Sequence, residues 1–223
     1  MGIKLTHTEE NYLKAIFKAN EKTAHTATTN TIASYINASA ASVTDMMKKL
    51  ANKDLIVYER YKGARLSQSG SKLATDLIRK HRLWETFLVD KLDFSWEEVH
   101  DIAEELEHIQ SEKLIQKLDE FLGFPKYDPH GDPIPNAEGR FTLREQKSLS
   151  VCNKETEGVV VGVKNHETKF LQHLNELSIK LGTVLKIIDK SGYDHSLKVM
   201  IDQDRIQTIT DSTAQNLLIR PSK

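Results

Sequence analysis

HRLWE at residues 81–85 and HDIAEELEH at residues 100–108 determine how we expect this chain to fold. The second segment contains four potential metal ligands at helical spacing: His100, Glu104, Glu107 and His108. Residues four, seven and eight positions apart share one face of an α-helix, so the pattern predicts a row of imidazoles and carboxylates. His81 and Glu85 repeat the four-residue spacing on the preceding segment. Two such helices packed together predict a cation site with nitrogen and oxygen ligands; the alternative is a solvated acidic face.

The composition is that of a water-soluble globular protein. The 223 residues suffice for one large domain or two smaller ones, and 39% of them are hydrophobic. No apolar run reaches the ~18 residues of a membrane-spanning helix, and the N-terminus lacks the features of a signal peptide. The single cysteine, Cys152, excludes an internal disulfide. We therefore expect a cytoplasmic protein that does not bind a membrane.

Charge is distributed unevenly along the chain. Residues 1–75 contain 11 Lys and Arg against 6 Asp and Glu, a balance of +5, whereas residues 76–125 contain 6 against 13, a balance of −7. A basic N-terminal third favours binding to a polyanion such as duplex DNA, and an acidic middle segment favours binding of cations.

The N-terminal third has the pattern of a helix-turn-helix. Residues 8–20 predict an amphipathic helix with Thr8 as its N-cap, and residues 31–35 predict a short helix. Residues 39–53 (SAASVTDMMKKLANK) predict a helix that opens with small polar side chains. In this motif such a helix lies in the major groove of DNA. The predicted contacts from it are Ser39, Ala41, Ser42, Thr44 and Lys48.

LIVYER at residues 55–60 and ARL at residues 64–66 predict a basic two-stranded hairpin directly after this helix. A hairpin in this position is a wing, and its cations contact the phosphate backbone or the minor groove. The predicted wing contacts are Arg60, Lys62 and Arg65.

Two helical segments follow, at residues 71–91 and 97–121, and they carry more apolar surface than one winged helix can cover. We predict that part of this surface forms a homodimer interface, as a two-fold operator requires. Residues 123–141 contain four of the five prolines and predict a loop or linker, in which we interpret His130 as a residue that orders the loop.

Residues 148–223 have a different pattern, with five short β-type runs around a helical segment at residues 169–177. This pattern predicts a small SH3-like barrel. The predicted fold class is therefore mainly α with a small β domain. The expected domains are a winged helix-turn-helix at residues 1–72, a helical metal-binding and dimerisation domain at 73–141, and the SH3-like domain at 148–223.

Together these motifs resemble the diphtheria toxin repressor and manganese transport regulator family of metal-dependent repressors. The resemblance rests on TEENYLKAIF (residues 8–17), RKHRLWETFL (79–88), VHDIAEELEHIQSEKL (99–114) and DPHGDPIP (128–135), and it extends over nearly the whole chain. The C-terminal part is similar to the family's SH3-like (FeoA-like) domain. The resemblance implies a transcriptional repressor of metal homeostasis, not an enzyme.

The resemblance also implies two metal sites. The primary, activating site corresponds to Asn11, Glu104, Glu107 and His108; the ancillary site corresponds to His81, Glu85, His100 and Glu167, with His166 as a rival for Glu167. Glu104 stands where the iron-sensing branch has cysteine, which favours Mn²⁺, with Fe²⁺ as the alternative. Lys14 stands where some manganese regulators have a further carboxylate, which argues against a second bridging ion.

The alternative functions are an enzyme with a metal centre and a regulator with another effector. A di-iron carboxylate enzyme would use Glu-x-x-His motifs on different helices, but here both motifs lie between Glu97 and His108 on one helical stretch. A zinc hydrolase would need HExxH, which the chain lacks. A winged-helix regulator whose effector is a small molecule remains open.

Overall fold

We describe a computed structural model of the chain, covering residues 4–23, 26–59 and 62–222. The chain forms two compact units that are interleaved in sequence. The first comprises Met1–His81, Glu105–Ser111 and Pro135–Arg140, and the second comprises Arg82–Glu104, Glu112–Ile134 and Phe141–Lys223. The three-domain division by sequence stays a prediction.

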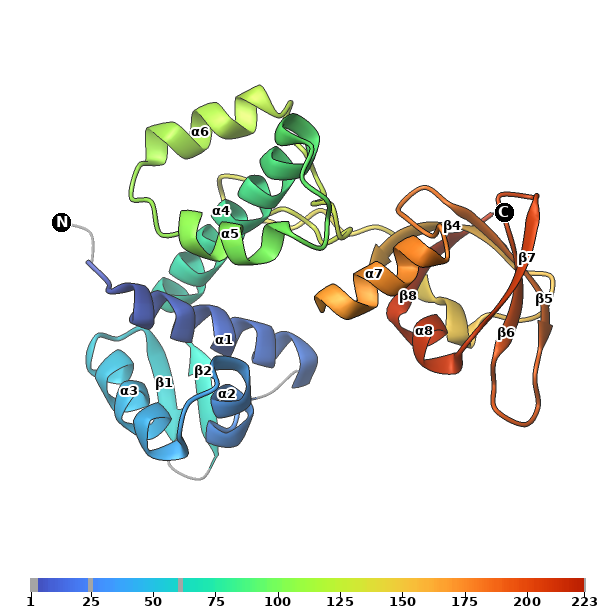
Figure 1. The fold of residues 1–223 in the computed structure, drawn as a ribbon. Coiled ribbons are helices and arrows are strands. Elements are labelled where there is room, and N and C mark those ends of the chain that lie inside the picture. The colour runs from blue at the N-terminus through green and yellow to red at the C-terminus, as the bar shows by residue number, and fades with distance from the viewer. Residues whose placement is uncertain (1–3, 24–25, 60–61, 223) are drawn as a thin grey trace. The chain divides into compact units, whose positions relative to one another are not determined.

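The first unit contains the winged helix-turn-helix that the sequence predicts. Helices α1 (His7–Thr23), α2 (Thr29–Ile36) and α3 (Ala40–Asn52) precede a hairpin of β1 (Ile56–Glu59) and β2 (Gly63–Leu66), as Figure 1 shows. Their apolar faces meet in one core, whose fully buried members include Leu13, Ile16, Ile32, Met47 and Leu50. The predicted elements and their order are confirmed.

The start of α1 differs from the prediction. Thr6, not Thr8, supplies the cap: its hydroxyl accepts a hydrogen bond from the Glu9 amide (3.3 Å), and the Glu9 carboxylate accepts one from the Thr6 amide (2.9 Å). This reciprocal pair is a capping box, and it requires an acidic residue three positions after the cap. Thr8 has Asn11 at that position, whereas Thr6 has Glu9.

The turn between α2 and α3 is set by its polar residues. Asn37 ends α2 in the left-handed conformation (φ 53°), and the Ser39 hydroxyl accepts a hydrogen bond from the Ser42 amide at the start of α3. Asn tolerates the left-handed region and Ser is a favoured N-cap, so the two helices are joined by a tight turn.

The hairpin is fixed to the loop before α2. Ala27 and Ala64 exchange two backbone hydrogen bonds of 2.8 Å. Gly63 enters β2 with φ +104°, and a Cβ atom there would lie 2.4 Å from the Ala27 carbonyl oxygen. Glycine is therefore required at this position, because any side chain would push the wing away from the loop.

The predicted helical stretch at residues 97–121 is wrong in its continuity. After α4 (Gln68–Leu92) the chain forms α5 (Val99–Leu106) and α6 (Glu112–Phe121), with a turn closed by the Ile109 amide on the Leu106 carbonyl. Glu107 and His108 follow the last residue of α5, so they do not share a helical face with His100 and Glu104. Contacts with α1 and α4, described below, hold both side chains outside the helix.

The second unit contains an antiparallel sheet in the order β3-β8-β4-β5-β6-β7. Its elements are β3 (Lys147–Ser148), η1 (Leu149–Val151), β4 (Glu157–Val163), α7 (Thr168–Glu176), β5 (Val184–Lys190), β6 (Leu197–Ile201), β7 (Arg205–Ile209), α8 (Asp211–Asn216) and β8 (Leu217–Pro221). The five predicted runs and the helical segment are confirmed. Two-residue β3 and six-residue α8 were missed because neither is long enough to show a period.

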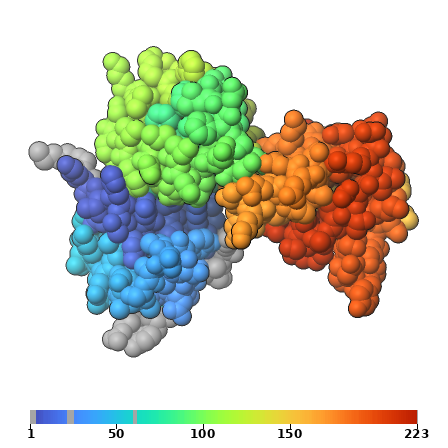
Figure 2. Space-filling view, viewed as in Figure 1, coloured from blue at the N-terminus to red at the C-terminus, as the bar shows by residue number. Residues whose placement is uncertain are grey.

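The β5–β6 hairpin extends from this sheet (Figure 2), and Tyr193 at its tip is 97% exposed. The inward faces of the strands form an apolar core with α7 that includes Val160, Leu171, Leu185 and Val199. Among the described residues, none of the helices is both long and apolar enough to span a bilayer.

Glu9 fixes α1 to the C-terminal end of α3. Its carboxylate is fully buried, lies 2.6 Å from Lys53 Nζ and 3.2 Å from Lys49 Nζ, and also caps α1. Burial raises the pKa of Glu9, but the hydrogen bonds from Lys53, the Thr6 amide and Lys49 outweigh it and lower the pKa to about 2. The folded protein therefore stabilises the ionised form.

We predict that Glu9→Gln lowers the free energy of unfolding by about 2 kcal/mol at pH 7, the scale of a hydrogen-bonded charge. Because the folded pKa is depressed, this contribution is present above the ordinary carboxyl pKa and is lost as the pH falls from about 4.5 towards 2. Urea unfolding at pH 7 and pH 3 checks it, with the exposed Glu138→Gln as control. A Glu9→Gln deficit that is equal at both pH values would contradict it.

Candidate metal centre and DNA-binding surface

Glu107 is the centre of a buried charged cluster in the first unit. One carboxylate oxygen, Oε2, accepts a hydrogen bond from Lys14 Nζ on α1 (2.5 Å) and lies 2.6 Å from His81 Nδ1 on α4. Lys14 Nζ is also 3.3 Å from His81 Nδ1. Glu107 is 0%, Lys14 4% and His81 6% exposed. The cluster joins three segments that are distant in sequence.

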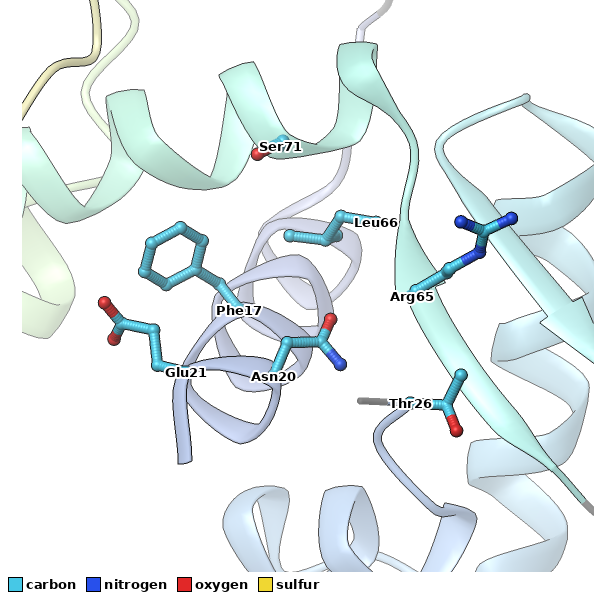
Figure 3. Close-up of a pocket in the computed structure, with 7 residues that line it drawn as sticks. All are labelled: Phe17, Asn20, Glu21, Thr26, Arg65, Leu66 and Ser71. Carbon is cyan, nitrogen blue, oxygen red and sulfur yellow. The ribbon is translucent and has the colours of Figure 1, made fainter. Parts of the chain in front are cut away.

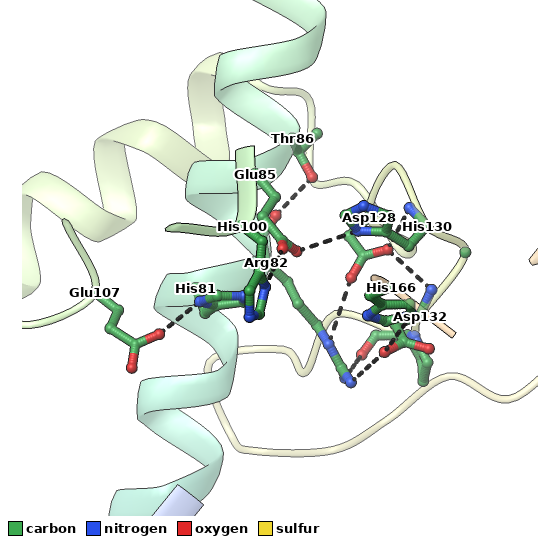
Figure 4. Close-up of polar contacts among 12 residues, drawn as sticks. His81, Arg82, Glu85, Thr86, His100, Glu107, Asp128, His130, Asp132 and His166 are labelled. Atoms are coloured by element: carbon green, nitrogen blue, oxygen red, sulfur yellow. Dashed lines mark hydrogen bonds and ion pairs between the residues drawn. The ribbon is translucent and has the colours of Figure 1, made fainter. Parts of the chain in front are cut away.

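The sequence predicted His81 with Glu85 and His100. In the structure, Nδ1 of His81 lies 2.6 Å from Glu107 Oε2 (Figure 4), and the grouping of His81 with Glu85 and His100 stays a prediction.

The adjacent His108 contacts α1 as well. Its Nδ1 lies 2.6 Å from Glu10 Oε2, and the Glu10 Oε1 atom accepts a hydrogen bond from Gln110 Nε2 (2.9 Å). The sequence singled out Asn11 and overlooked Glu10. The only signal for Glu10 was its place beside Asn11 in TEENYLKAIF, because a carboxylate in the first turn of a helix is ordinary.

Two oxygen atoms, one on α1 and one in the segment after α5, have no hydrogen-bond partner among the described residues. They are Asn11 Oδ1 and Glu107 Oε1, and both are buried. A buried acceptor without a partner costs roughly 1–3 kcal/mol, so such atoms are expected to have a further ligand. An amide oxygen and a carboxylate oxygen both bind Mn²⁺ or Fe²⁺, so this donor set fits the predicted ion.

The second unit contains another cluster, built from Glu85, Asp128 and His130. One ligand atom from each lies within 4.8 Å of the other two, and all three residues are buried. Glu85 Oε2 is 3.7 Å from His130 Nδ1, and Glu85 Oε1 is 3.3 Å from His100 Nδ1. His130 Nδ1 is buried without a hydrogen-bond partner in the described part of the chain. These groups can hold a cation.

Figure 4 shows the side chains around this cluster converging from α4 (Glu85), from α5 (His100) and from the proline-rich loop (Asp128 and His130). His130 Nε2 lies 2.8 Å from the Trp96 carbonyl oxygen, which leaves Nδ1 directed at Glu85. The sequence interpretation of His130 as an ordering residue therefore missed the acidic groups around it. DPHG contained the signal, because it places a carboxylate and an imidazole two residues apart.

The electrostatics of this cluster reflect its burial. Burial and the neighbouring Glu85 and Asp132 carboxylates raise the pKa of Asp128 to about 7, against an opposing effect of Arg82. Burial lowers the pKa of His130, but the Glu85 and Asp128 carboxylates outweigh it and raise the pKa to about 9. The buried carboxylates of Glu85 and Asp128 and the partly exposed one of Asp132 therefore lie close together beside Arg82 and His130.

The proline-rich loop is ordered around Asp128. The Asp128 carboxylate accepts hydrogen bonds from the His130 and Asp132 amides (2.8 and 3.0 Å), and Arg82 pairs with Asp132 (3.0 Å). A Cβ on Gly131, which has φ +90°, would lie 2.1 Å from the Val161 carbonyl oxygen in β4. This close approach brings the loop against the SH3-like sheet.

His166, not Glu167, lies beside this cluster. The His166 ring stacks on His130 with centroids 4.7 Å apart, and its Nε2 is 4.0 Å from Asp132. Glu167 is exposed and forms the N-cap position of α7. Its role as a ligand stays a prediction, and the geometry favours the rival residue. Glu104 lies 3.6 Å from His100 on the same helix.

The predicted DNA-binding residues lie on accessible surface. Ser39, Ala41, Ser42 and Lys48 are exposed on α3, whereas Thr44 is half-buried and its hydroxyl donates to the Ala40 carbonyl. Lys62 and Arg65 are exposed on the wing. Arg60 lies outside the described residues.

A pocket beside the wing is lined by Phe17, Asn20, Glu21, Thr26, Arg65, Leu66 and Ser71. Figure 3 shows Phe17, Asn20 and Glu21 on α1, Leu66 and Ser71 across the pocket from them, and the Arg65 guanidinium directed away from α1. This is where a small-molecule effector would be sought, but the buried unsatisfied ligand atoms lie elsewhere.

Comparison with known families matches each part of the chain. Residues 4–64 match the iron dependent repressor N-terminal DNA binding domain, residues 67–136 match the metal binding and dimerisation domain, and residues 147–221 match the FeoA domain. A solved manganese-dependent transcriptional repressor in complex with manganese is 32% identical, with a TM-score of 0.87 over 96% of this chain and 100% of that one. The chain belongs to the iron-dependent repressor family.

Curated members of this iron-dependent repressor family and one other protein give partial matches. Iron-dependent repressor IdeR of Mycobacterium tuberculosis is 33% identical over 132 residues, which are 59% of this chain and 57% of that protein. A probable metal transport system membrane protein of Chlamydia trachomatis is 47% identical over 70 residues, 31% of this chain and 16% of that protein. These matches thus span 57% and 16% of the lengths of the two curated proteins.

We predict that Lys14→Met destabilises the metal-free protein by about 3 kcal/mol or more at pH 8, because it leaves Glu107 buried without its cation. Thermal or urea unfolding in chelator measures the loss. The double variant Lys14→Met/Glu107→Met should recover most of it, since no buried charge remains. Equal stability of the single and double variants would contradict the prediction.

Proposed function

We propose that this chain is a transcriptional repressor that binds duplex DNA as a homodimer when Mn²⁺, or alternatively Fe²⁺, is bound. One observation carries the proposal: buried candidate ligand atoms lie where α1 of the DNA-binding unit meets the segment after α5. Membership of the family and the likeness to a manganese-dependent repressor support it. Control of metal uptake follows as the expected role.

The proposed activating site consists of Asn11, Glu104, Glu107 and His108. Glu107 Oε1 and Asn11 Oδ1 are the free oxygen donors, and His108 supplies an imidazole. A bound divalent ion would supply positive charge that these donors share. Asn11 lies on α1, so its engagement with Glu107 restrains the helix that packs under the recognition helix α3. Such restraint raises the population of the DNA-competent state.

The proposed ancillary site differs from the predicted set. We assign Glu85, Asp128 and His130, with His100 as a further donor to Glu85, because their ligand atoms converge and His130 Nδ1 is unsatisfied. One solved relative is described as ScaR with bound Zn²⁺, at 30% identity and a TM-score of 0.76. The residues present therefore suit a divalent cation in both units.

The proposed DNA surface is the exposed N-terminal end of α3 together with the wing. Ser39, Ala41 and Ser42 are small, so the helix can approach base edges closely. Lys62 and Arg65 provide positive charge for phosphates, which determine affinity but not sequence.

The first test is a DNA-binding titration with protein stripped by chelator and duplexes selected from a random-sequence pool in Mn²⁺. We expect Mn²⁺ to raise affinity by at least ~10-fold, with Fe²⁺ close behind, and Zn²⁺ to bind without full activation. His108→Ala should abolish activation, and His130→Ala should remove one equivalent of bound Mn²⁺. Arg65→Ala should reduce the salt slope by about one contact. Equal affinity with and without metal would refute the proposal.

Dimerisation is proposed from exposed apolar side chains of the second unit. Leu92, Phe94, Leu114, Phe121 and Phe124 are 36–64% exposed. Exposed apolar residues in such number are typical of an interaction surface, and a two-fold partner suits a palindromic operator.

Sedimentation of Mn²⁺-loaded protein should give about twice the chain mass of 25.4 kDa. The double variant Phe121→Glu/Phe124→Glu should shift this towards the monomer, because it places charges in the apolar surface. Tyr193→Glu is the control, since Tyr193 is also an aromatic residue and still more exposed but lies on the β5–β6 hairpin. A wild-type monomer bound to DNA would exclude the dimer.

A further inference from the structure

The His108 ring is held on two sides by residues of the first unit. Nδ1 lies 2.6 Å from Glu10 Oε2, and His7 stacks on the ring with centroids 4.3 Å apart and planes 5° apart. Gln110 donates to the other Glu10 oxygen at 2.9 Å. The side chains of His108 and Glu10 are 8% and 13% exposed, so the contact is largely shielded from water.

This contact determines which ring nitrogen is free. An ionised carboxylate only accepts hydrogen bonds, so the hydrogen between Glu10 and His108 is on Nδ1. In a neutral imidazole the lone pair available to a cation is then on Nε2. Stacking by His7 limits rotation of the ring.

We propose that Glu10 is a positioning residue of the activating site: it fixes the Nδ1–H tautomer and the orientation of His108, so that Nε2 is the metal-binding atom. This inference rests on the proposed function. A carboxylate that accepts from the second nitrogen of a ligand histidine typically contributes 10–100-fold to metal affinity. Glu10 therefore acts through His108 and is not itself a ligand.

The position of Glu10 adds a second consequence. Glu10 lies on α1, 98 residues before His108 in the chain. When Nε2 donates its lone pair, the Nδ1–H group becomes more acidic and its hydrogen bond to Glu10 becomes stronger. Metal affinity and the attachment of α1 are then coupled, and the coupling is reciprocal.

The test compares Mn²⁺ binding by calorimetry in wild type, Glu10→Ala, Glu10→Gln and Glu105→Ala. We expect Glu10→Ala to weaken Mn²⁺ binding ~10- to 100-fold. Glu10→Gln should lose less, because its amide oxygen still accepts from Nδ1–H. The Mn²⁺ affinity of Glu105→Ala should stay within about threefold of wild type. Glu105 is an exposed carboxylate three residues from His108, so its substitution removes the same charge as Glu10→Ala.

A spectroscopic readout separates positioning from stability and from direct ligation. In ¹⁵N NMR of protein loaded with diamagnetic Zn²⁺, His108 should show Nδ1–H and metal-bound Nε2 in wild type and Glu10→Gln. Glu10→Ala should show a mixture of His108 tautomers, or a His108 ring that does not bind the metal. Metal on Nδ1 in wild type, or wild-type affinity in Glu10→Ala, would overturn the inference.

If Glu10→Ala does not fold, the inference is tested by the tautomer of His108 in wild type and in Glu10→Gln alone. If the DNA affinity of wild-type protein is the same with and without Mn²⁺, the proposed function is refuted instead. The two failures are therefore distinguishable.

Discussion

The buried carboxylate of Glu107 is the group on which the arrangement of the first unit depends. A carboxylate without access to water must be paired, and here Lys14 from α1 and His81 from α4 provide the partners. Because those partners come from different helices, the pairing also fixes α1 against α4. Helix α5 ends at Leu106, directly before Glu107. The other oxygen of Glu107, Oε1, is buried and has no hydrogen-bond partner in the part of the chain that the structure describes.

Much of the fold follows from local patterns in the sequence. Periodic apolar residues give α1, α3 and α4, and alternation gives the strands of the SH3-like domain. The capping box at Thr6 was also present in the sequence, three residues before Glu9, but the two acidic residues directly after Thr8 suggested a later start. The capping-box pattern alone identifies the start of α1, and the prediction of Thr8 in place of Thr6 was wrong.

The site was less predictable because tertiary contacts decide it. Helical spacing predicted that His100, Glu104, Glu107 and His108 share one face. Glu107 and His108 instead lie after the end of α5, where they contact residues of α1 and α4. Nothing in the spacing of residues 100–108 could indicate that Glu10 and Lys14, almost 100 residues earlier, would compete for them. Likewise, Asp128 and His130 meet Glu85 only because the proline-rich loop folds back towards α4.

Ligand chemistry narrows the choice of ion without deciding it. Both clusters offer carboxylate and imidazole donors, and the first also has the Asn11 amide oxygen. The single thiol, Cys152, is a buried residue of the SH3-like core. Intrinsic affinity would still favour Zn²⁺ over Mn²⁺ at such donors. In the proposed activating site, discrimination would then come from geometry: an ion would activate only if its coordination engaged Asn11 together with the donors after α5. Zn²⁺ favours four ligands, so it can be bound by fewer residues and leave α1 unrestrained, whereas ions that accept more oxygen donors engage both segments.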